Sequence, residues 1–98
     1  MPVVMQMRWD GVTAEQYDEA RDKVRWEEDA PEGGMFHVSW FVDGAMHIID
    51  VWESPEAFQS FVDERLMPGV QALGIEGQPE VAIQPAHRVL DQVHGDRW

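Results

Sequence analysis

Two residues of this 98-residue chain, His37 and Asp50, combine acid/base chemistry with a spacing that can bring them together. They lie on either side of Asp43-Gly44, a dipeptide suited to the two-residue type I′ turn of a β-hairpin. Counting outward from that turn places His37 directly opposite Asp50 on the neighbouring strand. A carboxylate beside an imidazole holds the ring in one tautomer, as a general base or acid requires. The same pair can also be a purely structural hydrogen bond, and both interpretations stay open.

The side chains that share the hairpin face of His37 and Asp50 are mostly large and apolar, as in a ligand pocket. Trp52 offers a flat ring that can stack on an aromatic substrate, although core packing explains it equally well. Arg8, on the more polar face of the first predicted strand, can hold an anionic oxygen of a ligand or form an ion pair with Asp50. We expect the substrate-binding residues to be Trp52, Arg8, Gln6, Ser39, Met35 and Phe41.

Metal and phosphate chemistry finds little support in the sequence. The chain has no cysteine, which excludes thiolate catalysis and cysteine-based metal sites. His37 and Asp50 supply at most two ligands, fewer than the three protein ligands of a catalytic zinc site. The chain also lacks a glycine-rich phosphate loop and a Gly-x-Ser-x-Gly motif. We therefore expect no metal and no cofactor.

Hydrophobic spacing predicts the elements that position the pair. Residues 2–9 alternate as in a half-buried strand, and a capping box of Thr13 and Gln16 begins a helix whose apolar stripe includes Tyr17. The acidic segment 26–34 forms a loop before the hairpin. Ser54-Pro55-Glu56 then provides the N-cap and first turn of a second helix. That helix should stop or kink at Pro68-Gly69, and residues 80–84 form a last strand.

The order strand, helix, strand, strand, helix, strand is the ferredoxin-like α+β pattern, with a four-stranded antiparallel sheet and two helices on one face. We expect residues 1–85 to form one such domain and residues 86–98 a C-terminal arm or tail. The more uniformly apolar hairpin face should lie under the helices; it carries Phe36, Val38, Trp40, Val42, Ile49 and Val51. The face with His37 and Asp50 must then be covered by a second copy, so we expect a homodimer that encloses a cavity between two sheets.

Composition narrows the partners. The chain has 19 Asp and Glu residues against 7 Lys and Arg, a formal net charge of −12, which disfavours nucleic acid and anionic membranes. No segment approaches the length of a membrane span, and the first residues lack the pattern of a signal peptide. We expect a cytoplasmic protein whose partner is a small organic molecule.

The nine residues from Asp50 to Phe58, Asp-Val-Trp-Glu-Ser-Pro-Glu-Ala-Phe, resemble the third strand and second helix of the antibiotic biosynthesis monooxygenase family. The order of elements extends the resemblance over residues 1–85, and it is closest to uncharacterised small members. It implies a dimeric α+β barrel that oxygenates a small aromatic or polyketide-like molecule without a cofactor. Many members carry histidines in the second helix where this chain has Phe61 and Arg65, which counts against haem binding.

Two functions remain open. In the first, implied by the resemblance, His37 oriented by Asp50 takes a proton from a substrate hydroxyl in the dimer cavity, and the anion reacts with oxygen. An isomerase or cyclase could use the same pair. In the second, the chain is a non-catalytic dimeric binding or accessory module, and both residues are structural. A ligand-sized cavity lined by His37, Asp50 and Trp52 would favour an enzyme, whereas a cavity filled by apolar side chains would favour the module.

Overall fold

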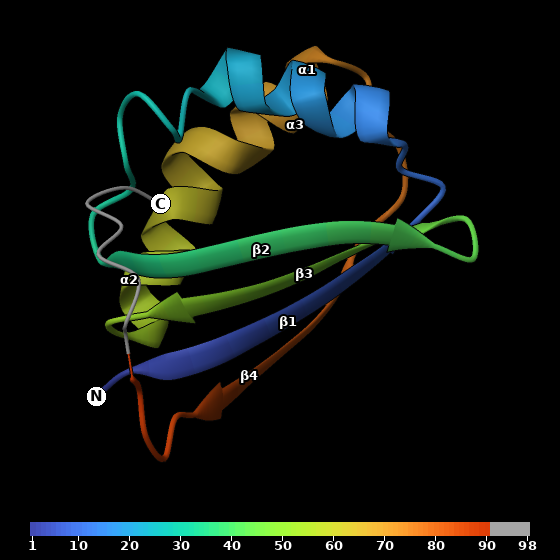
Figure 1. Ribbon diagram of the computed structural model, residues 1–98. Coiled ribbons are helices and arrows are strands. Elements are labelled where there is room, and N and C mark those ends of the chain that lie inside the picture. Colours follow the sequence, from blue (N-terminus) through green and yellow to red (C-terminus); the bar gives the residue numbers. More distant parts are fainter. Residues whose placement is uncertain (91–98) are drawn as a thin grey trace.

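A computed structural model describes residues 1–90 of the chain. The elements are β1 (Val3–Asp10), α1 (Ala14–Val24), β2 (Gly34–Val42), β3 (Ala45–Trp52), α2 (Pro55–Phe61), a π-helical segment η1 (Val62–Leu66), α3 (Met67–Ala72) and β4 (Glu80–Pro85). The strands form one antiparallel sheet in the order β2-β3-β1-β4, and the helices cover one face of it (Figure 1). The predicted ferredoxin-like α+β fold is confirmed. Most of the predicted C-terminal arm, residues 91–98, lies outside the described residues.

Helices α1 and α2 begin where the sequence places their caps. Thr13 Oγ1 accepts the Gln16 N–H at 3.1 Å, and the Gln16 side chain accepts the Thr13 N–H at 3.0 Å, so the predicted capping box is complete. Ser54 Oγ accepts the Ala57 N–H at 3.1 Å, with Pro55 in the first turn. A cap of this kind stabilises a helix by about 1 kcal/mol. The caps therefore fix where each helix leaves the sheet.

The expected break at Pro68-Gly69 takes the form of a π-helical segment rather than the end of a helix. The Met67 N–H bonds to the Val62 carbonyl five residues earlier, directly before the proline. Proline has no N–H and clashes with the carbonyl of the preceding helical turn, and a wider turn relieves both problems. Gly69 then lets α3 approach α1, because a Cβ at this position would lie 2.6 Å from Val24 Cγ2.

Among the described residues, no helix is both long and apolar enough to cross a membrane.

The hairpin has the predicted register around its turn. Asp43 and Gly44 have φ angles of 55° and 72°, the left-handed conformation that a type I′ turn requires at both positions. His37 lies opposite Asp50, as the turn predicts. The placement of the pair thus follows from two turn residues and the length of the strands.

The hairpin register departs from the prediction only at the far end of β2. A register shift between Gly34 and Phe36 places Gly34, rather than Met35, opposite Trp52. The predicted pairing of Met35 with Trp52 is therefore wrong. The shift inserts one residue without a partner, as a β-bulge does, and a bulge cannot be recognised from alternation alone.

The two faces of the hairpin are reversed relative to the prediction. The side chains under the helices are Met46, Ile48, Asp50 and Trp52, which are all at most 8% exposed. The face expected to be buried is open instead. Its β2 residues, Phe36, Val38, Trp40 and Val42, are 39–52% exposed. The prediction that His37 and Asp50 face a cavity between two sheets is therefore wrong, because they face the helices of their own chain.

Strand β1 accounts for the choice of face. Its apolar residues Met5, Met7 and Trp9 lie opposite Asp50, Ile48 and Met46 and share their face. Because β1 is an inner strand, that face must be the one the helices cover. Its alternate residues Gln6, Arg8 and Asp10 are exposed on the open side. A period of two shows which residues share a face, but it does not show which face receives the helices.

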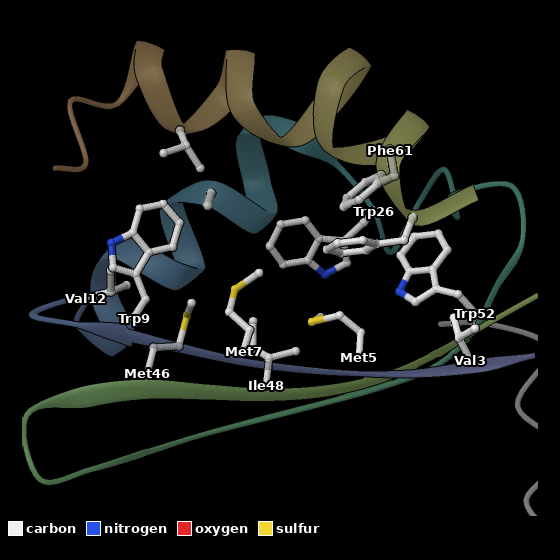
Figure 2. Close-up of a cluster of buried hydrophobic side chains, with 13 residues drawn as sticks. Val3, Met5, Met7, Trp9, Val12, Trp26, Met46, Ile48, Trp52 and Phe61 are labelled. Atoms are coloured by element: carbon white, nitrogen blue, oxygen red, sulfur yellow. The ribbon is translucent and has the colours of Figure 1, made fainter. Parts of the chain in front are cut away.

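The core between the sheet and the helices is built largely from methionine and tryptophan. Figure 2 shows Met5, Met7 and Met46 pointing from the sheet toward the helices, with Trp9 and Trp52 toward the two ends. Trp26 joins this core although it lies in the acidic segment predicted to be a loop. The core thus combines rigid rings with flexible thioether side chains, which adapt to irregular space.

Gly33, just before β2, offers a test of how tightly the hairpin is docked on α2. It has a φ angle of 86°, and a Cβ there would lie 2.6 Å from the Ala57 Cβ. We expect Gly33→Ala to lower the free energy of unfolding by about 2–4 kcal/mol, because left-handed strain adds to steric overlap. Gly44→Ala is the control, because Gly44 also has a positive φ angle, 72°, but an added Cβ there would meet nothing within 4 Å. This change should lower the free energy of unfolding by about 1–2 kcal/mol. Urea unfolding followed by tryptophan fluorescence measures both, and equal losses would contradict close docking at Ala57.

Candidate active site

A chain of hydrogen bonds runs through the core from α1 across β2 to β3. The Tyr17 hydroxyl lies 2.7 Å from His37 Nε2, and His37 Nδ1 lies 2.7 Å from Asp50 Oδ1. Trp52 Nε1–H donates to Asp50 Oδ2 at 3.0 Å. Facing positions in the hairpin bring His37 to Asp50, and a spacing of two along β3 puts Trp52 on the same side. Helix α1 and strands β2 and β3 thus place Tyr17, His37, Asp50 and Trp52 in one continuous chain of hydrogen bonds.

The contacts of Asp50 fix where the protons lie. An ionised carboxylate only accepts hydrogen bonds, so both of its partners must be donors. His37 therefore carries a proton on Nδ1, and in the neutral form of the ring Nε2 presents a lone pair. The Tyr17 hydroxyl must then donate to that nitrogen. One direction of donation, from Tyr17 to His37 to Asp50, satisfies the whole chain.

Burial strengthens these contacts. The side chains of His37 and Asp50 are 11% and 5% exposed, and two donors offset the cost of removing the carboxylate from water. Burial also raises the pKa of the Tyr17 hydroxyl above its ordinary 10.0, and the nearby carboxylates of Glu27 and Asp50 act in the same direction. A hydrogen bond with Ser39 acts in the opposite direction on that pKa. Tyr17 is therefore a neutral donor at physiological pH.

The Tyr17 ring is held by aromatic neighbours. Trp26 meets it nearly edge-on with ring centroids 5.4 Å apart, and Phe41 does so at 6.0 Å. The His37 ring is nearly parallel to it, with an interplanar angle of 9° and a centroid distance of 6.0 Å. Contacts from two segments, β2 and the loop after α1, thus restrict how far the phenol can move from His37.

The two helix positions where the resembling family often has histidine perform structural tasks here. Phe61 packs against Trp52, with ring centroids 5.5 Å apart. Arg65 Nη2 donates to the carbonyls of Val24 and Asp29 at 3.1 and 2.7 Å, which ties the end of α1 and the loop carrying Trp26 to η1. Within residues 1–90, no three histidine, cysteine, aspartate or glutamate side chains are arranged to hold a metal ion.

A cavity of about 50 Å³ lies beside the hydrogen-bond chain, between the sheet and the helices. Tyr17, His37 and Asp50 all line it, and most of the remaining wall is apolar, including Met5, Met7, Met46, Phe58 and Phe61. This volume holds a few waters or a diatomic gas, whereas benzene occupies an engineered cavity of about 150 Å³. An aromatic ring can therefore enter only if side chains in the wall move. The methionines are the wall residues best suited to do so.

The structure brings together only part of the predicted substrate-binding set. Trp52 contacts Asp50, and Phe41 and Ser39 lie next to Tyr17. Trp52 does not line the cavity, however. Met35 lies at the register shift of β2 and is 39% exposed.

The two polar residues predicted on β1 lie on the other side of the sheet. Arg8 is opposite His47, and its Nε bonds to Asp10 Oδ1 at 2.9 Å. The predicted ion pair of Arg8 with Asp50 is therefore wrong. Gln6 is opposite Ile49 and is also on the open face. Neither side chain reaches the cavity, because alternate residues of one strand point to opposite faces.

Sequence reasoning missed Tyr17 and Trp26 as parts of the site. The spacing of the first helix predicts that Tyr17 is buried on its apolar stripe, but it does not predict the hydrogen bond to His37. The available signal was that this stripe must face the same side of the sheet as the apolar residues of β1. For Trp26, the signal was a large aromatic residue at the start of an acidic loop, which suggests an anchor in the core.

Comparison with known proteins establishes the fold of the chain. No family model and no curated protein matches its sequence. A variant of SnoaB, a cofactor-independent oxygenase from Streptomyces nogalater, matches with a TM-score of 0.66 and 18% identity, over 91% of this chain and 96% of that one. A protein of unknown function from Nitrosomonas europaea matches with a TM-score of 0.71 and 8% identity, over 94% of this chain and 95% of that one. A Deinococcus radiodurans protein provisionally classed as an antibiotic biosynthesis monooxygenase matches with a TM-score of 0.59 and 12% identity, over 95% of this chain and 99% of that one.

These likenesses define a class of fold. The chain has the ferredoxin-like fold found in antibiotic biosynthesis monooxygenases, as its sequence resemblance implied. The same fold occurs in a named oxygenase and in a protein of unknown function. The activity must therefore be argued from the site, because one fold hosts many chemistries.

Asp50 should be essential to stability as well as to the site. We expect Asp50→Asn to lower the free energy of unfolding by about 2–4 kcal/mol, because an amide presents one acceptor oxygen where two donors require acceptors. Asp43→Asn is the matched control: Asp43 is exposed at φ 55°, a conformation that asparagine tolerates, so the change should stay within about 0.5 kcal/mol. Urea unfolding measures both variants. Similar small effects would contradict the assigned hydrogen bonds.

Proposed function

We propose that this protein is a cofactor-independent oxygenase that acts on a small phenolic molecule of aromatic or polyketide type. The observation that carries this proposal is a base, His37, held by buried Asp50 at the wall of an apolar cavity. The fold likeness to a cofactor-independent oxygenase from Streptomyces nogalater supports the same class of reaction. The sequence resemblance points in the same direction.

The proposed chemistry needs a base more than it needs a redox group of the protein. Removal of the phenol proton produces an electron-rich phenolate, which gives one electron to dioxygen. The two radicals then combine to form a carbon–oxygen bond at the ring position para to the hydroxyl, and protonation gives a hydroperoxide. Loss of water leaves a quinone. One oxygen atom enters the product, and the other leaves as water with the hydroxyl hydrogen and the hydrogen of the attacked carbon.

The cavity suits such a substrate in polarity but must enlarge to admit it. An apolar wall favours a neutral phenol over an anion, and the hydrogen-bonded Tyr17, His37 and Asp50 in that wall would receive the proton of its hydroxyl. A ring needs more than the present 50 Å³, and rearrangement of Met5, Met7 and Met46 would provide the space.

A non-catalytic binding module is the second candidate. The small volume of the cavity favours it, because a core that is nearly filled needs His37 and Asp50 only as a satisfied polar pair. In that case the chain would bind a small apolar molecule without turnover.

We also propose that the protein is a homodimer formed through the open face of the sheet. This face exposes Phe36, Val38, Trp40 and Val42, an apolar row that a lone domain rarely leaves uncovered. Beside Trp40, His47 Nε2 is shielded from solvent and has no hydrogen-bond partner among the described residues. A second copy would cover this apolar row.

Loss of the base should abolish turnover. With 1-naphthol as the probe, we expect the wild-type chain to consume one dioxygen per 1,4-naphthoquinone formed. His37→Ala should lower the rate by about 10²–10⁴-fold, the usual contribution of a positioned base. His87→Ala, at an exposed position away from the cavity, is the control and should have no effect. An oxygen electrode and quinone absorbance measure both. Full activity in His37→Ala would rule out the mechanism, and binding of 1-naphthol without turnover by the wild type would favour the module.

Two identical substitutions separate the faces of the sheet. Val38 and Val81 are 39% and 43% exposed, but Val38 lies on the open face and Val81 lies opposite Met7 on the helix side. We expect Val38→Glu to convert the dimer to a monomer, because it buries charge in the proposed interface. Val81→Glu should leave the dimer intact. Sedimentation velocity at low micromolar concentration measures the oligomeric state of the wild type and both variants. A monomeric wild type would contradict the proposed dimer.

A further inference from the structure

The nitrogen that His37 would offer to a substrate is already engaged. Its Nδ1 is held by Asp50 Oδ1 and its Nε2 by the Tyr17 hydroxyl, each at 2.7 Å. A substrate hydroxyl in the cavity therefore finds no exposed lone pair on the imidazole as the site stands. The Tyr17 oxygen, in contrast, uses its one proton in the bond to His37 and accepts a hydrogen bond from Ser39, which leaves it one further acceptor position for a substrate hydroxyl.

We propose that Tyr17 is a catalytic residue that passes the substrate proton to His37. This inference rests on the proposed oxygenase function and assigns the group that touches the substrate. The substrate O–H bond breaks as its proton bonds to the Tyr17 oxygen, and the original Tyr17 proton moves to His37 Nε2. The substrate becomes a phenolate, Tyr17 is unchanged, and His37 becomes an imidazolium paired with the Asp50 carboxylate. One proton is transferred and no electron moves in this step.

The surroundings of Tyr17 suit a relay. Tyr17, His37 and Asp50 line the same cavity, so a ligand there can reach the phenol. Edge contacts with Trp26 and Phe41 hold the ring against His37 rather than leaving it free to swing aside. Burial keeps the hydroxyl protonated, which a relay needs in order to have a proton to pass on. The buried Asp50 carboxylate stabilises the imidazolium that forms.

In the competing arrangement, Tyr17 only blocks His37 Nε2 until a substrate binds, as a plug would. In that case the substrate displaces the phenol and bonds directly to His37 Nε2, and the Tyr17 hydroxyl takes no part in proton transfer. The two arrangements make opposite predictions for Tyr17→Phe. A relay loses its proton path, whereas a plug that has lost its bond to His37 is easier to displace.

A binding experiment on the full chain tests the contact without requiring turnover. Phenol is the probe, and ¹⁵N spectra of the histidine rings are the readout, with His37 assigned by its absence in His37→Gln. We expect phenol to bind the wild type saturably and leave the Nε2 resonance nearly unchanged, because Tyr17 stays on that nitrogen. In Tyr17→Phe, phenol should bond to Nε2 and move its resonance. An equally large shift in the wild type, or no phenol binding, overturns the relay.

Kinetics test the proton path, and the sequence makes the test selective. Tyr17 is the only tyrosine of the chain, so global incorporation of a fluorinated tyrosine lowers the pKa of this one phenol. Tyr17 must be neutral to donate, so the alkaline limit of 1-naphthol turnover should move to lower pH when fluorination lowers the pKa of Tyr17. Tyr17→Phe should reduce kcat at least tenfold with KM changed less than about threefold, within the usual range for proton-transfer groups. An unmoved pH profile or an unchanged kcat overturns the relay. A wild type without turnover instead defeats the proposed function, while the ring-nitrogen spectra still decide the contact.

Discussion

The structure of the site depends on one constraint: a carboxylate buried in an apolar core must receive hydrogen bonds. Asp50 is 3% exposed, and its two oxygens accept from Trp52 and His37. Leaving either oxygen without a donor would cost a large part of the stability of a small domain. The need for donors fixes the tautomer of His37, and the tautomer in turn fixes the direction in which Tyr17 donates. A requirement of folding thus fixes the direction of hydrogen-bond donation from Tyr17 to His37 to Asp50.

Much of this arrangement follows from local sequence. Asp43-Gly44 sets the register that pairs His37 with Asp50, and the caps at Thr13 and Ser54 set where the helices begin. Each depends on residues a few positions apart, so the relevant physics is contained in a short window. The order of elements then leaves few topologies to consider, which is why the ferredoxin-like fold could be predicted.

The side of the sheet that carries the site could not be derived from the hairpin alone. The hairpin alone predicts that the more apolar face of β2 and β3 is buried under the helices. A polar pair such as His37 and Asp50 can nevertheless lie in a core when its hydrogen bonds are satisfied. The missing constraint was in β1, where Met5, Met7 and Trp9 identify the helix-covered face of an inner strand. Tyr17 reaches His37 through the packing of α1 on that face. Such a contact depends on long-range geometry, which residue periodicity does not contain.

The reversed face changes how function and assembly are related. Had the pair faced a second sheet, the site would have required a dimer, and every monomerising change would also have been a site mutation. With Tyr17, His37 and Asp50 inside one chain, the open face stays available for the proposed association, and the two proposed roles lie on opposite sides of the same four strands. The site is instead coupled to folding, because Asp50 contributes both to the stability of the core and to the proposed site. Activity lost through Asp50 must therefore be judged against stability, whereas the Tyr17 hydroxyl can be removed while the ring and its packing remain.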